Sequence, residues 1–189
     1  MAKIDADMVL EKRYFEKILD AFCEDERLGI TGGVLINEST SGGVRGGNRV
    51  FRKECWSDIS DNGYMPIITP EDTYLSVKAQ YKGWKVKVVR DAKTIHLRPL
   101  KTTSLLNKLK RRIDAGYASY SIGYHPLLFL GRLAKLTIFD YPPLVTAMPM
   151  VWGWIFAWIK KETIDPELKT YLRRLQRNRV AEVCSGLMR

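Results

Sequence analysis

Cysteine and histidine are both scarce in this chain of 189 residues, which has three cysteines and two histidines. Cys23, Cys55 and Cys184 lie far apart in the sequence and form no CxxC pair. This spacing argues against a cysteine-based zinc site and against a disulfide framework, and it is typical of a reducing compartment. The first residues also lack the apolar segment of a secretory signal. We therefore expect the protein to act inside the cell.

Acidic residues are scarce in the second half of the chain only. Residues 1–99 carry 16 Lys and Arg against 15 Asp and Glu, whereas residues 100–189 carry 15 against six. A basic segment usually meets nucleic acid, anionic lipid or phosphorylated ligands. Binding of nucleic acid predicts aromatic side chains interleaved with basic ones, but the aromatic residues of this half cluster in an uncharged run. We therefore expect lipid or phosphate partners and no nucleic acid.

Charged residues are absent from Tyr141–Ile159, which is about as long as a segment that spans a bilayer core. Prolines interrupt this run, tryptophans gather at one end, and Lys160 and Lys161 follow. Tryptophan and lysine favour the membrane interface. We expect residues 126–161 to form a membrane-associated helical hairpin or re-entrant segment at the cytoplasmic face of the cell membrane. A complete span and a helix buried in a soluble domain are the alternatives.

Periodicity predicts an α/β first part and a helical second part. The predicted strands are Ala2–Asp5, Gly29–Ile36, Arg49–Phe51, Trp84–Val89 and Lys93–Leu97. The predicted helices are Glu11–Phe22, one from Lys53, one from Glu71 to Tyr81, Leu105–Ile122, Pro126–Phe139 and Pro166–Val183. A glycine-rich loop is expected over Asn37–Gly47. The domains expected are residues 1–99, a basic amphipathic helix over 100–125, the apolar segment 126–161 and a basic helix over 162–189.

Two acidic pairs stand where chemistry is common. Asp5 and Asp7 follow a predicted strand, and two carboxylates so placed can hold Mg²⁺ or Mn²⁺ that bridges to phosphates. Glu71 and Asp72 begin a predicted helix behind a loop, where a carboxylate can act as a general base. The alternative for each pair is a structural role, in which the acids cap the N-terminus of a helix. His96, at a predicted strand end, is a structural residue or a metal ligand.

The order of these features resembles the second half of the family 2 glycosyltransferases. The matching residues are Asp5-Ala6-Asp7, Gly32-Gly33, Gly46-Gly47 through Arg52, Glu71-Asp72, Gly83-Trp84 and His96. The resemblance covers about residues 1–125. It implies an incomplete GT-A fold, which is a Rossmann-like mixed sheet flanked by helices, followed by a helical tail. It also implies an inverting transfer of sugar from a nucleotide-sugar donor to a lipid-linked or surface-glycan acceptor.

The resemblance also implies a role for each matching residue. Asp5 and Asp7 would hold the metal ion on the donor diphosphate, with His96 as a later metal or diphosphate contact. Asp72 would take the proton from the acceptor hydroxyl, and Glu71 would be its neighbour. The expected substrate-binding residues are Gly46, Gly47, Arg52 and Trp84. Arg111 and Arg112, in the predicted basic helix, are further candidates that could reach the donor diphosphate or an acceptor lipid phosphate. The basic group that includes Arg111 and Arg112 is explained as well by a solvated helix face.

Two departures from the family pattern limit the resemblance. The Gln-x-x-Arg-Trp motif of processive members is absent, so a single-addition enzyme is favoured. The Asp5-Ala6-Asp7 triplet has no nucleotide-binding strands before it, so we expect this chain to be inactive or very weak alone. A further chain would then supply the missing half. The alternative is a non-catalytic, membrane-bound partner module that keeps the fold.

Overall fold

The computed structural model describes residues 1–37, 43–66, 70–97, 104–139, 145–161 and 163–187. It divides into two compact units, residues 1–101 and residues 102–189. The first unit is α/β, and the elements described in the second are all helices. Pro99, at the predicted domain boundary, lies outside the described residues. So do residues 38–42 of the predicted loop and residues 141–144 of the uncharged run.

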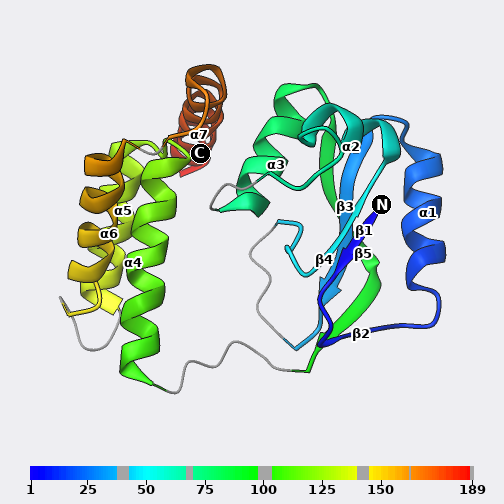
Figure 1. Cartoon of the computed structure of the whole chain (residues 1–189), viewed down its shortest axis with the longest axis horizontal. Coiled ribbons are helices and arrows are strands. Elements are labelled where there is room, and N and C mark those ends of the chain that lie inside the picture. The colour runs from blue at the N-terminus through cyan, green and yellow to red at the C-terminus, as the bar shows by residue number, and fades with distance from the viewer. Residues whose placement is uncertain (38–42, 67–69, 98–103, 140–144, 162, 188–189) are drawn as a thin grey trace. The chain divides into compact units, whose positions relative to one another are not determined.

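A five-stranded mixed sheet forms the centre of the first unit, with the strand order β1-β4-β3-β5-β2. The strands are β1 (Ala2–Ile4), β2 (Met8–Leu10), β3 (Leu28–Leu35), β4 (Asn48–Phe51) and β5 (Lys85–His96). β3 and β5 are parallel, and the other pairings are antiparallel. Helix α1 (Tyr14–Glu24) lies on one side of the sheet, and α2 (Lys53–Ile59) and α3 (Glu71–Tyr81) lie on the other (Figure 1). The predicted α/β class is confirmed.

Two strands differ from the sequence prediction. The two short strands expected after Trp84 are one strand, β5, whose pairing with β3 changes register where Gly33 opposes Val89 and Val34 opposes Lys93. This irregularity interrupts the alternation of side chains, so the sequence suggests two strands. β2 is not among the predicted strands. It forms at the sheet edge by pairing with the end of β5.

Helix α3 begins and ends where the sequence predicts. Pro70 precedes the first residue of α3 and is extended. Proline has no backbone N–H to donate, so it is well suited to the position at which a helix begins. Gly83 has φ of +89° just beyond the helix, a conformation that glycine adopts without steric cost. The chain can therefore turn directly into β5. These two residues fix the first turn of α3, which carries Glu71 and Asp72, over the sheet.

A small buried cluster joins α1 to the sheet. Its members are Tyr14, Ile18, Val50 and Ala92. The Tyr14 hydroxyl donates to the backbone oxygen of Asn48 at 2.9 Å and accepts from the backbone N–H of Gly33 at 3.0 Å. A Cβ atom on Gly33 would lie 2.3 Å from the backbone oxygen of Ala92, so this close approach requires glycine. The cluster fixes β4 against β3 and α1.

The second unit contains α4 (Leu105–Ser121), α5 (Pro126–Phe139), α6 (Met148–Lys160) and α7 (Pro166–Leu187). Helices α4 and α6 touch backbone to backbone. A Cβ atom on Gly116 would lie 1.9 Å from the backbone oxygen of Met150, and one on Gly153 would lie 2.0 Å from that of Ile113. The two glycines therefore set the crossing of these helices.

Helix α6 is shorter than the uncharged run Tyr141–Ile159 that it overlaps. Helix α6 has 13 residues, which at 1.5 Å per residue gives a length of about 20 Å. A bilayer core is about 30 Å thick. No helix in the described part of the chain is both long enough and apolar enough to cross a membrane. Membrane association remains a prediction.

Candidate functional site

The acids of α3 meet two basic residues of the sheet. Lys3 on β1 forms an ion pair with Glu71, and its ammonium nitrogen lies 3.9 Å from Asp72 Oδ1. Arg49 on β4 places its Nε 3.9 Å from the same oxygen and donates from Nη1 to the backbone oxygen of Asp72 at 2.8 Å. Two cations therefore attract the carboxylate of Asp72 and hold the first turn of α3 against the sheet.

The register of the sheet explains this arrangement. Lys3 on β1 is directly opposite Arg49 on β4, and Arg49 is opposite Gly32 on β3. Like charges directly opposite each other destabilise an antiparallel pair. Glu71 and Asp72 offset this repulsion, because they supply two negative charges at the same place. The acids and the two cations therefore form one electrostatic unit.

Arg49, a member of this electrostatic unit, was not predicted from the sequence. Its side chain is buried, and its guanidinium also donates to the backbone oxygen of Val44 at 3.0 Å. Burial lowers the pKa of Arg49, and the negative charges of Asp72 and Glu71 oppose that shift. The signal available in the sequence was an arginine within the predicted strand Arg49–Phe51, because a charge in a strand that becomes buried needs a partner.

One oxygen of the Asp72 carboxylate has no hydrogen bond within the described part of the chain. Its side chain is 42% exposed, yet Oδ1 is buried and has no hydrogen-bond partner among the described residues. The 3.9 Å separations from Lys3 and Arg49 are too long for hydrogen bonds. A buried acceptor without a partner is uncommon and costly. The Asp72 carboxylate therefore combines an exposed portion with a buried acceptor that has no hydrogen-bond partner among the described residues.

Gly46 and Gly47 bring the two predicted acidic sites together. A Cβ atom on Gly46 would lie 1.9 Å from Asp72 Oδ2, and one on Gly47 would lie 2.4 Å from Asp5 Oδ2. The backbone N–H of Asp5 also donates to the backbone oxygen of Gly47 at 2.8 Å. Because consecutive Cα atoms are about 3.8 Å apart, the carboxylates of Asp5 and Asp72 lie within roughly 11 Å of each other. Each glycine therefore lies directly against one of the two carboxylates.

Asp7 and His96 form the third part of the site. His96 Nε2 lies 3.2 Å from Asp7 Oδ2, and the backbone N–H of Leu97 donates to the backbone oxygen of Asp7 at 2.8 Å. The edge pairing of β2 with β5 places them side by side. Within the ranges that the structure describes, no group of three or more His, Cys, Asp or Glu residues could hold a metal ion. Asp7 and His96 therefore form a pair of candidate ligands and not a group of three or more.

No family model and no curated protein matches this chain. An assignment of activity therefore rests on the arrangement of Asp5, Asp7, Asp72 and His96 and on the resemblance of their sequence motifs.

The other predicted substrate-binding residues lie elsewhere. The Arg52 guanidinium donates to the backbone oxygens of Phe22 in the last turn of α1, Asp25 just beyond it, and Leu28 at the start of β3. The Trp84 indole donates to Asp58 Oδ2 at 2.8 Å, beside α2. Both side chains have structural partners, and neither contacts Asp5 or Asp72. Arg111 and Arg112 lie on α4 in the second unit.

Proposed function

We propose that the first unit is the acceptor-side, catalytic half of an inverting glycosyltransferase of family 2. Its donor is a nucleotide-activated sugar, and its acceptor is lipid-linked or a surface glycan. The observation that supports the proposal is the contact of the neighbouring residues Gly46 and Gly47 with the carboxylates of Asp72 and Asp5, respectively. Two acids brought this close to one stretch of backbone could both face one transferred sugar.

In the proposed reaction, Asp72 accepts the proton of the acceptor hydroxyl. The hydroxyl oxygen bonds to the anomeric carbon, while the bond from that carbon to the donor diphosphate breaks on the opposite face. This single displacement inverts the configuration. Lys3 and Arg49 keep the Asp72 carboxylate in position throughout, because they bind Glu71 and the backbone oxygen of Asp72. Glu71 acts as the partner of Lys3 and does not accept the proton.

Asp7 and His96 would hold Mg²⁺ or Mn²⁺, which stabilises the negative charge of a leaving diphosphate. Asp5 has an exposed side chain that lies against Gly47, so a ligand can reach it.

The experiment measures sugar transfer from a panel of nucleotide-sugars to a lipid extract. The full chain is assayed alone and with a polypeptide that carries the nucleotide-binding half of a family 2 enzyme. Asp72→Asn should lower turnover by about 10²–10⁴-fold, because a carboxamide cannot accept the proton. Donor binding should change little.

Glu71→Gln is the comparison variant. It keeps the Asp72 carboxylate but weakens the Lys3–Glu71 ion pair, so we expect a smaller loss than in Asp72→Asn. A larger loss of turnover in Glu71→Gln than in Asp72→Asn would show that Asp72 is not the general base. Absence of transfer both alone and with the added half would contradict the proposed function and favour a non-catalytic module.

A further inference from the structure

Helix α6 has two opposite faces of different kinds. Met150, Gly153 and Ala157 are buried, and Gly153 meets the backbone of α4. The opposite face carries Met148 and Trp152, which are 69% and 63% exposed, and continues to Ile159. The spacing of these exposed residues, four and seven positions, keeps them on one side of a helix. The outward face of α6 is thus a continuous apolar stripe.

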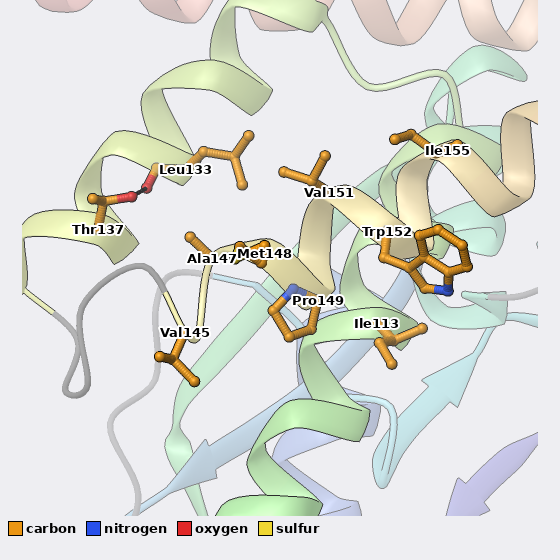
Figure 2. Close-up of a pocket in the computed structure, with 10 residues that line it drawn as sticks. All are labelled: Ile113, Leu133, Thr137, Val145, Ala147, Met148, Pro149, Val151, Trp152 and Ile155. Carbon is orange, nitrogen blue, oxygen red and sulfur yellow. Dashed lines mark hydrogen bonds between the residues drawn. The ribbon is translucent and has the colours of Figure 1, made fainter.

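A groove lies beside this stripe (Figure 2), with a volume of about 720 Å³. Its walls come from α4, α5, α6 and the residues just before α6. They are Ile113, Leu133, Thr137, Val145, Ala147, Met148, Pro149, Val151, Trp152 and Ile155. The only hydroxyl among them, on Thr137, already donates to the backbone oxygen of Leu133 at 3.0 Å. The groove therefore suits hydrocarbon rather than a polar ligand.

Positive charge accompanies this apolar surface. Residues 105–161 contain eight Lys and Arg against two Asp. At the end of the stripe, the Lys160 ammonium lies 4.8 Å from the centre of the Phe156 ring, and Lys161 is exposed beside it. Lysine that packs its stem on apolar surface and presents its charge at the edge is typical of membrane interfaces.

We propose that the outward face of α6, with the groove beside it, docks on an anionic lipid bilayer. Trp152 and Met148 enter the acyl boundary, an acyl chain fills the groove, and Lys160 and Lys161 meet the headgroups. Helix α6 lies in the interface plane, because about 20 Å of helix does not reach across a core of about 30 Å. A second copy of the chain is a less favourable occupant than an anionic bilayer. A second copy would bring the same positive residues to the contact, and like charges repel. This inference does not depend on the proposed transferase activity.

The test is flotation of the full chain with vesicles of phosphatidylcholine alone or mixed with phosphatidylglycerol. We expect binding to the mixed vesicles, and high salt should weaken it without abolishing it, because salt screens only the charged part. The double variant Met148→Ser/Trp152→Ser should lose about tenfold or more of this binding. The double variant Leu19→Ser/Tyr64→Ser is the matched control, since it changes equally exposed apolar residues of the first unit.

A second variant tests the charge component separately. Lys160→Glu/Lys161→Glu should remove the preference for anionic vesicles, a loss of about tenfold or more in affinity. It also keeps the proposal testable if the first double variant fails to fold. A full chain that does not float with either vesicle would overturn the proposal. So would equal binding by all variants, or a stable dimer that depends on Trp152 and does not bind lipid.

Discussion

Gly46 lies so close to Asp72 that any side chain at position 46 would displace the carboxylate. The position of a Cβ atom on Gly46 is 1.9 Å from Asp72 Oδ2. The absence of a side chain at position 46 therefore allows the Asp72 carboxylate to lie against the backbone. This contact links the glycine-rich loop to the first turn of α3.

The first prediction concerns this contact. Gly46→Ala should lower the rate of sugar transfer by about 10²-fold, because a displacement of about 1 Å in a reacting group can cost that much. Gly43→Ala is the control, since a Cβ atom there would have no neighbour within 4 Å. The measurement is kcat for both variants in the assay described above. Equal rates would show that the position of Asp72 does not matter for the reaction.

The second prediction concerns the metal ligands, and its measurement does not depend on activity. Mn²⁺ should broaden the nuclear magnetic resonance signals of the His96 ring. Asp7→Ala should weaken this effect by about tenfold or more, because it removes a charged oxygen ligand. His125, the only other histidine in the chain, is an internal reference, and Asp20→Ala on α1 is the control variant. Asp5→Ala should have a smaller effect, because Asp5 contacts Gly47. Unchanged broadening in Asp7→Ala would exclude the Asp7 and His96 pair.

The third prediction compares two glycines of the second unit. Gly153→Ala should lower the free energy of unfolding by about 1–3 kcal/mol, because its Cβ atom would meet the backbone of Ile113 at 2.0 Å. Gly131→Ala on α5 should raise the free energy of unfolding by about 0.5–1 kcal/mol, because its Cβ atom would have no neighbour within 4 Å and alanine favours a helix. Denaturant unfolding measures both. A rise in stability for Gly153→Ala would be inconsistent with the α4–α6 contact.

The fourth prediction concerns two thiols. Cys23 is exposed, whereas burial raises the pKa of the buried Cys55 thiol to about 12. Because the thiolate is the nucleophile, an aromatic disulfide reagent at neutral pH should modify Cys23 and leave Cys55 unmodified in a Cys184→Ser background. Rapid modification of both thiols in the folded protein would contradict the burial of Cys55.

The same shift predicts a dependence of stability on pH. Because the pKa of the Cys55 thiol is higher in the folded state, the thiol contributes its full stabilisation below the usual thiol pKa of 9.0. This contribution to the free energy of unfolding is lost as the pH rises from 9.0 to about 12. Over this range, the stability of the unaltered chain should fall more steeply with pH than that of Cys55→Ala.

Much of the candidate site could be predicted from local sequence. Pro70 followed by Glu71 and Asp72 predicts a helix start with acids in its first turn, and the structure has it there. Arg52 shows the limit of motif spacing. It matches the family pattern by position, but its guanidinium binds backbone oxygens near the end of α1. A motif gives the order of residues along the chain and not the direction in which a side chain points.

The sequence by itself determined the helices, the α/β class and the change to a basic, apolar second half, because periodicity, proline, glycine and charge act over a few residues. Only the tertiary structure decided that Lys3 and Arg49 meet the acids of α3. Those residues are far apart in the chain, and their contact depends on the register of β1 with β4, which local pattern does not specify. Likewise, the uncharged run does not reveal which of its faces is buried. The backbone contact of Gly153 with α4 decided that face and left Met148 and Trp152 on the exposed side.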